Sequence, residues 1–263
     1  MRVAKKSAFT LIELLIASSL TALVMFALIA GLNAFMNHRQ LETSKPSLAI
    51  ECYQVLNMME NDLTQKCTSL GNLVRRGHAY AFEYTVSASI GDHPSLSFFK
   101  NSKKGPLALC YGTRALPNAI QNQEKNAYGL FRVLKSENDS YLLWSNEVEE
   151  ISAEFTDDEL CLLKNLISES IVHFEIHLAK FSSDRLTLDY LNTDAQDIRI
   201  FQGKGLLNKD VFELRQLAFL EITLWAVGKS QQNEYWERQS DDEKSEYVQK
   251  QGIKMSRLVP WYI

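Results

Sequence analysis

The sequence lacks the short motifs that identify common classes of enzyme. It contains no G-x-S-x-G elbow, and Gly228-Lys229-Ser230 is not a phosphate loop, because Thr223 stands where the first glycine would be. It also has no internal repeat and no low-complexity linker. Catalytic triads assemble in space, so these absences do not exclude an enzyme. They leave no residue to which catalysis can be assigned, and we expect no catalytic residues and no cofactor.

Charge is nearly absent from one stretch near the N-terminus. Residues 9–32 contain a single charged side chain, that of Glu13, and as a helix they would be about 36 Å long, enough to cross a bilayer. The first 32 residues carry a net charge of +2; the whole chain carries −4, so the remainder carries −6. An acidic remainder argues against a domain that holds nucleic acid through its phosphates.

Three interpretations fit this N-terminus. A secretory signal peptide would have a shorter apolar core, of roughly 7–15 residues, followed by a cleavage site with small residues. A plain signal anchor would keep the basic residues Arg2, Lys5 and Lys6 in the cytoplasm, but it does not explain the acid Glu13 within an uncharged span. The third interpretation is a leader that is cleaved before the apolar run.

The residues at the start of the apolar run support the third interpretation. After Lys5 and Lys6 the chain reads Ala8-Phe9-Thr10-Leu11-Ile12-Glu13. This stretch resembles the class III leader of type IV pilins and type II secretion pseudopilins, in which a short basic leader ends in Gly or Ala before Phe-Thr-Leu-Ile-Glu. The resemblance implies that a prepilin peptidase cleaves after Ala8 and that Phe9 becomes the N-methylated terminus. Ala8 is a departure, since Gly is the commoner residue at that position.

The resemblance also gives Glu13 a role in assembly. Cleavage would free the amine of Phe9, four residues before Glu13. A carboxylate in apolar surroundings needs such a partner, because an unpaired buried charge is strongly unfavourable. In the family, the acid of one subunit meets the terminal amine of its neighbour as the helices pack into a filament. The alternative is an interfacial Glu13 that reaches toward lipid headgroups.

Helical periodicity continues beyond residue 32. Apolar residues at spacings of three and four form one stripe, which predicts a helix packed on a domain. The stripe consists of Leu48, Cys52, Val55, Met59 and Leu63. Pro46 is expected to kink or interrupt the helix or to open a second one, and Gly71 is expected to follow its end. The pattern thus predicts one long helix over about residues 9–70, its first half in lipid.

The rest of the sequence has the character of short strands joined by turns. The strand-like segments are residues 79–86, 96–100, 107–111, 128–134, 141–144, 148–155, 171–181, 185–191, 217–227 and 255–263. Residues 157–168 fit a short capped helix, and the polar residues 231–251 a helix or loop. The predicted fold class is α+β: a long N-terminal helix, with a membrane half and a packed half, followed by a pilin-like antiparallel β-sheet domain.

Length and the C-terminal pattern indicate a subgroup of the family. The runs 220–227 and 256–261 resemble J-type minor pseudopilins or W-type minor pilins, which do no chemistry and join other minor subunits in a tip complex. The expected domains are a leader (1–8), a transmembrane assembly helix (9–32), its amphipathic continuation (33–70) and a β-rich periplasmic domain (71–263).

The resemblance implies a single-pass protein of the inner membrane that enters a pilus or pseudopilus. Its expected partners are other pilin or pseudopilin subunits, the prepilin peptidase and inner-membrane lipid, but not nucleic acid. The alternative function is a membrane-anchored periplasmic enzyme or binding module.

One local cluster has the residue types of a metal site. On a strand, His173, Glu175 and His177 share a face, and two imidazoles with a carboxylate can bind zinc. The same pattern is typical of a half-exposed strand, so we predict no metal. The acidic runs 157–159 and 241–243 lack the spacing of a calcium loop and are interpreted as helix starts.

The four cysteines are expected outside the cytoplasm, where disulfides persist. Cys52 and Cys67 would lie about 22 Å apart on one helix, too far to bridge. We favour a bridge between Cys67 and Cys110. Free buried cysteines are the alternative, since Cys52 lies on the apolar stripe.

Overall fold

The computed structural model describes the chain in segments: residues 11–66, 82–87, 93–116, 127–145, 151, 154–182, 187–191, 198–201, 204–207, 210–213 and 217–261. The chain divides into two compact units, residues 1–46 and residues 47–263. Each is described by itself below. Helix α1 (Leu11–Thr64) begins in the first unit and ends in the second. It continues through Pro46, so Pro46 neither interrupts the helix nor opens a second one.

In the first unit, the described side chains are those of residues 18–32, which are all exposed, and of Lys45 and Pro46 at its end, of which Lys45 is partly buried. No helix in the described part of the chain is long and apolar enough to cross a membrane. This finding corrects the expectation of a transmembrane, single-pass helix and, with it, the expected location in the inner membrane.

The expected fold class is therefore wrong as it was formulated. It required a long N-terminal helix whose first half lies in a membrane, but no helix in the described part of the chain is long and apolar enough to cross one. The first stretch with described side chains is the short run 18–32. It also expected one antiparallel sheet, whereas the strands form two separate antiparallel sheets. The observed fold is a mixed α and β structure with two sheets.

The larger sheet, sheet A, has eight strands in the order β10-β9-β8-β1-β2-β3-β4-β5. Their bounds are β1 Phe82–Ser87, β2 His93–Ser102, β3 Gly105–Ala115, β4 Tyr128–Leu134, β5 Leu166–Ser168, β8 Ile198–Phe201, β9 Lys204–Leu207 and β10 Asp210–Glu213. Sheet B has four strands in the order β12-β11-β6-β7. Their bounds are β6 Ile171–Phe181, β7 Leu188–Tyr190, β11 Phe219–Ala226 and β12 Ile253–Pro260.

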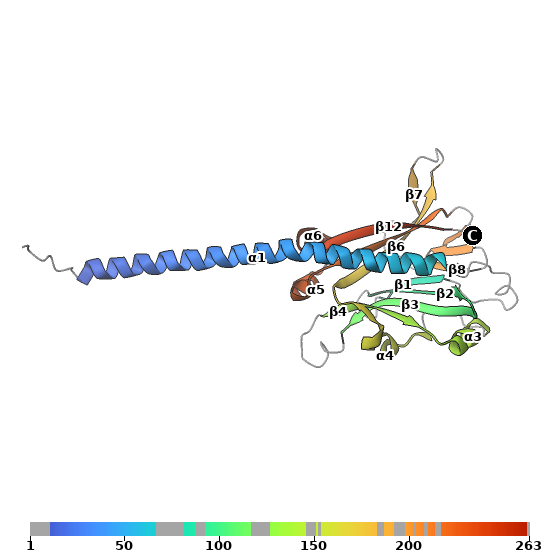
Figure 1. Cartoon of the computed structure of the whole chain (residues 1–263). Coiled ribbons are helices and arrows are strands. Elements are labelled where there is room, and N and C mark those ends of the chain that lie inside the picture. Colours follow the sequence, from blue (N-terminus) through green and yellow to red (C-terminus); the bar gives the residue numbers. More distant parts are fainter. Residues whose placement is uncertain are drawn as a thin grey trace, which may run out of the picture. The chain divides into compact units, whose positions relative to one another are not determined.

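Short helices connect these strands. They are α3 (Glu137–Ser145), α4 (Asp157–Leu160), the 3-10 turns η4 (Leu163–Asn165) and η6 (Lys229–Gln231), α5 (Gln232–Trp236) and α6 (Asp241–Gln251). Figure 1 shows α3 and α4 beside β3 and β4, and α5 and α6 near the start of β12. Helices α5 and α6 lie in the connection between β11 and β12.

The main hydrophobic core of the second unit lies between the C-terminal part of α1 and both sheets. All five residues of the predicted stripe, Leu48, Cys52, Val55, Met59 and Leu63, are buried in it. They pack with Phe98 and Leu109 of sheet A and with Ile176 and Leu224 of sheet B. The stripe was correctly interpreted as core, and its helix holds the two sheets together.

Two smaller clusters cover the opposite faces of the sheets. On sheet A, Phe131 and Val133 pack with Phe155 and with Leu160 of α4. On sheet B, Val172 and Trp225 pack with residues of α5 and α6. Each sheet thus has apolar contacts on both faces, which explains why the strand sequences are more continuously apolar than simple alternation would give.

One predicted strand, at residues 141–144, is helix α3 instead. The Ser136 hydroxyl accepts a hydrogen bond from the backbone N–H of Asp139 at 3.2 Å, and Glu137 and Asp139 lie in the first turn. A capping serine and early acidic residues stabilise a helix start, and they outweigh a four-residue strand-like pattern. Gly71 lies outside the described residues, and α1 ends at Thr64.

Two adjacent methionines test this packing. Met59 is fully buried in the main core, whereas Met58 is 38% exposed. We expect Met59→Ala to lower the free energy of unfolding by about 2–5 kcal/mol, because it leaves a cavity, and Met58→Ala to lower it by less than about 1 kcal/mol. Urea unfolding of both variants measures the difference. Equal losses would contradict the placement of the stripe.

Candidate functional site

Most of the sequence-predicted assembly residues lie where the structure gives no side-chain geometry. Ala8, Phe9 and Cys67 are outside the described residues. Glu13 is within α1, but its side chain is not among those described. The predicted cleavage, N-methylation and pairing of Glu13 therefore remain predictions from the sequence.

Residues 18–32 of α1, in the first unit, form an apolar helical surface. Its exposed large side chains are Leu20, Leu23, Val24, Met25, Phe26, Leu28, Ile29 and Leu32, and Phe26 is 76% exposed. Residues 18–32 contain no charged side chain. A helix that is apolar on all sides is normally buried, and a contiguous exposed apolar surface marks an interaction site. We call residues 18–32 the apolar helix segment.

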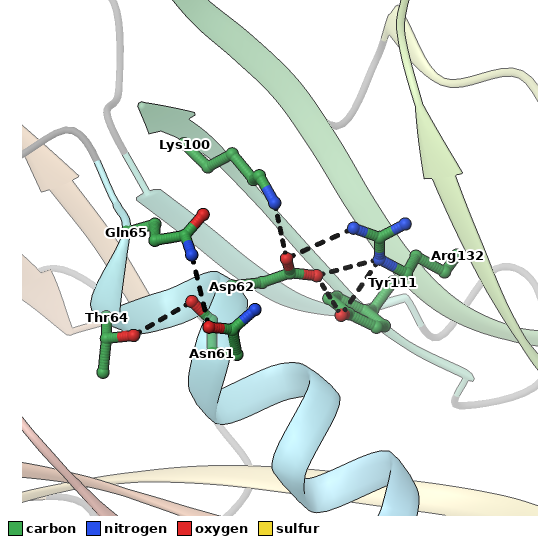
Figure 2. A network of polar contacts seen from close by, with 7 residues as sticks. All are labelled: Asn61, Asp62, Thr64, Gln65, Lys100, Tyr111 and Arg132. Atoms are coloured by element: carbon green, nitrogen blue, oxygen red, sulfur yellow. Dashed lines mark hydrogen bonds and ion pairs between the residues drawn. The ribbon is translucent and has the colours of Figure 1, made fainter. Parts of the chain in front are cut away.

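The second unit holds the C-terminal end of α1 through a buried carboxylate. Asp62 lies on α1 with its side chain 3% exposed, and it faces three strands of sheet A (Figure 2). Lys100 of β2 donates to Oδ1 at 2.8 Å, and the Tyr111 hydroxyl of β3 donates to Oδ2 at 2.5 Å. Arg132 of β4 donates from Nε to Oδ2 at 2.8 Å and from Nη2 to Oδ1 at 3.2 Å. We call these four residues the Asp62 network.

The electrostatics of the network favour the ionised carboxylate. Burial alone would raise the pKa of Asp62, but the hydrogen bonds from Arg132, Lys100 and Tyr111 outweigh it and lower the pKa below its ordinary value of 3.8. Burial and the neighbouring carboxylate raise the pKa of Tyr111, so its hydroxyl remains a donor. The stabilisation is present at neutral pH and is lost only as the pH falls below 3.8.

Two further polar side chains of the sheets, Ser168 and Arg257, hold α1 in the second unit. Glu51 accepts a hydrogen bond from the Ser168 hydroxyl of β5 at 2.6 Å. Arg257 of β12 donates to Glu60 at 2.7 Å and to Asn57, and its guanidinium lies over the Tyr53 ring. Sheet A and sheet B therefore each bind the same helix, at different faces.

The histidine cluster on β6 forms as the strand periodicity predicts. Nε2 of His177 lies 3.5 Å from one Glu175 oxygen, and Nε2 of His173 lies 3.9 Å from the other. Lys254 approaches Glu175 at 3.6 Å, so a cation already neutralises the carboxylate. Within the described segments, no group of three or more His, Cys, Asp or Glu residues has the arrangement of a metal site.

The acidic runs are helix starts, as interpreted. Thr156 accepts a hydrogen bond from the N–H of Glu159 before α4, and Ser240 accepts one from Glu243 before α6. The negative side chains lie in the first turns, where the helix dipole favours them.

The described cysteines are free thiols. Cys52 and Cys110 are buried, and Cys161 is partly exposed. Burial raises the pKa of Cys52 to about 12, which leaves this thiol protonated and unreactive. The predicted partner of Cys110, Cys67, lies outside the described residues.

The Asp62 network was missed by the sequence reasoning. A signal was present, because Asp62 stands between the stripe residues Met59 and Leu63, at the edge of an apolar helix face. Its partners Lys100, Tyr111 and Arg132 come from three strands whose register the sequence does not specify. Only the assembled sheet brings them together.

No protein family, no curated protein and no solved structure matches this chain. The function is therefore inferred from the N-terminal motif and from the geometry described above.

Loss of the Asp62 charge tests the network. Asp62→Asn would leave the cations of Lys100 and Arg132 without their carboxylate, and we expect it to lower the free energy of unfolding by about 2–4 kcal/mol; Lys100 and Arg132 are partly exposed, which reduces the loss. The matched control is Asp157→Asn, at an acid that is 54% exposed and bound to Arg114, with an expected loss below about 1 kcal/mol. Urea unfolding at pH 7 compares them, and equal effects would contradict the role of Asp62.

Proposed function

We propose that this chain is a subunit of the type IV pilin and type II secretion pseudopilin class that assembles through its N-terminal helix. Two features in succession carry the proposal: the stretch Phe9-Thr10-Leu11-Ile12-Glu13 in the sequence and, beginning five residues after Glu13, the exposed apolar helix segment. An uncharged helix whose large side chains are exposed requires an apolar partner surface. The corresponding helix of another subunit supplies one.

The proposal assigns different tasks to the two units. The N-terminal helix packs with other subunits, and the two-sheet domain is the part that the assembly displays. The Asp62 network and the contacts of Arg257 and Glu51 support this division, because they fix the domain to the C-terminal part of the same helix. The protein acts by assembly rather than by catalysis.

Within the class, we infer a minor subunit of the J-type or W-type group. The two stretches that carry this likeness, residues 220–227 and 256–261, fall on the neighbouring strands β11 and β12. In register, Leu220 lies opposite Val259 and Leu224 opposite Met255. The proposed partners are other subunits with the same leader and a prepilin peptidase.

Processing is the first test. Co-expression of the full chain with a prepilin peptidase should remove residues 1–8 and leave an N-methylated Phe9, because the motif places the cleavage after Ala8. Mass spectrometry of the mature N-terminus measures this. Ala8→Gly, which introduces the commoner residue, should be processed at least as fast, and Ala8→Arg should not be processed. An intact Met1, or a new terminus near residue 35, would contradict the proposal.

The second test concerns Glu13. Glu13→Ala removes the acid proposed to meet the terminal amine of a neighbouring subunit, so we expect at least a tenfold loss of the chain from purified filaments, with the folded domain unaffected. The matched control is Glu137→Ala, at an exposed acid of α3, which should be incorporated normally. Normal incorporation of Glu13→Ala would exclude the proposed pairing.

A further inference from the structure

A buried lysine follows the end of α1. Lys66 stands two residues after Thr64, the last residue of the helix, and is only 6% exposed. Its backbone pairs with Lys100 of β2 in an isolated antiparallel bridge, and the N–H of Asn101 donates to the carbonyl of Gln65 at 2.7 Å. Thr64, Gln65 and Asn101 are all exposed. Sheet A thus holds Lys66 in place among residues that reach the surface.

The ammonium of Lys66 lies over an indole ring. Its Nζ is 4.2 Å from the centre of the Trp261 ring, which follows β12, and Figure 1 shows β12 running alongside the C-terminal part of α1. The ring is fixed in turn, because the backbone N–H of Trp261 donates to the carbonyl of Ala218 at 2.8 Å and Phe82 contacts the indole edge to face. The cation–π contact therefore has a defined geometry.

Two donors in this contact lack an acceptor. Among the described residues, no oxygen accepts a hydrogen bond from the Lys66 ammonium, and no carboxylate lies within ion-pair distance of it. The indole N–H of Trp261 is buried as well, and the same part of the chain provides no acceptor for it. Buried donors are normally paired, because an unpaired one loses its hydration without compensation. A cation–π contact offsets only part of that loss.

The nearby charges do not neutralise Lys66. Lys100, its partner in the backbone bridge, turns its ammonium to Asp62, and Arg132 binds the same carboxylate (Figure 2). These four side chains together carry three positive charges and one negative charge, in a chain whose net charge is −4. Burial lowers the pKa of Lys66 to about 8, with no acid acting against it, and the amine remains mostly protonated at pH 7. The end of α1 therefore has an excess of positive charge.

We propose that Lys66 and the indole N–H of Trp261 form a carboxylate-binding site. A carboxylate supplies the negative charge that the ammonium lacks, and its two oxygens can accept from both donors. A neutral acceptor would satisfy the hydrogen bonds but leave the buried charge uncompensated. The ligand is either a free organic acid or the acidic side chain of another protein, because both present the same group. This inference does not depend on the proposed assembly of the chain.

Proton–nitrogen NMR of the isotope-labelled full chain tests the site, because the indole N–H of Trp261 reports on its own hydrogen bond. Sodium acetate is titrated against sodium chloride at pH 7 and constant ionic strength, and Trp261→Phe assigns the signal. The Trp261 signal should move downfield and saturate, with a Kd on the order of 10 mM for so small an anion. Trp225 and Trp236 also have buried indole N–H groups without an acceptor in the described part of the chain, and their signals should not move.

Removal of the charge tests the role of Lys66. Lys66→Met keeps the apolar stem but not the ammonium, so the affinity for acetate should fall by about tenfold or more. The matched control is Lys104→Met, at a lysine whose side chain is 73% exposed and bound to Glu137, and its Kd should equal that of the unmodified chain. If Lys66→Met does not fold, Lys66→Gln takes its place with the same expectation.

A second titration separates the two sources of the carboxylate. Its probe is the peptide acetyl-Gly-Glu-Gly-amide, whose only charge is a glutamate side chain, and its control is the same peptide with glutamine instead. Tighter binding of the glutamate peptide than of acetate assigns the site to an acidic side chain of another protein. Equal or weaker binding, with acetate bound, assigns it to a free acid.

Three results would overturn the proposal. The first is a Trp261 signal that moves with neither acetate nor the glutamate peptide. The second is an unchanged affinity in the variant at position 66. The third is equal binding of the glutamine peptide, which would show that the site does not recognise the carboxylate.

Discussion

The architecture of the second unit depends on one buried carboxylate. The side chain of Asp62 projects from α1 and lies among Lys100, Tyr111 and Arg132, which belong to three consecutive strands of sheet A. A charge at this depth is tolerated only because two cations and a hydroxyl compensate for its lost hydration. The network therefore fixes the helix in both register and rotation, more specifically than apolar packing alone would do. The stripe from Leu48 to Leu63 then lies between the sheets.

The two units differ in whether their apolar side chains are buried. The second unit buries its own: α1 fills the space between two sheets, and α4, α5 and α6 contribute to clusters on their outer faces. The apolar helix segment of the first unit has all its described side chains exposed. The second unit thus buries its apolar surface, whereas the helix segment that precedes it in the sequence leaves its apolar surface exposed. We expect this arrangement in a subunit that assembles through the helix.

Features with local causes could be predicted from the sequence, and features of tertiary origin could not. The stripe of α1 and the long strand β6 follow from periodicity, and the caps before α4 and α6 follow from Thr156 and Ser240. The strand expected at residues 141–144 was wrong, because the Ser136 cap starts a helix there. The division into two sheets and the Asp62 network depend on pairings between distant strands, such as β1 with β8, which no local pattern encodes.

The central claim is that the apolar helix segment contacts other subunits, and site-specific photo-crosslinking tests it most directly. A photoreactive phenylalanine analogue replaces Phe26, the most exposed of the large apolar residues in that segment, in cells that express the other leader-bearing proteins. The same analogue at the exposed Tyr141 of α3 is the comparison. The account predicts an adduct at position 26 that joins the N-terminal helix of a second leader-bearing subunit. An absence of any protein adduct at position 26 would contradict it.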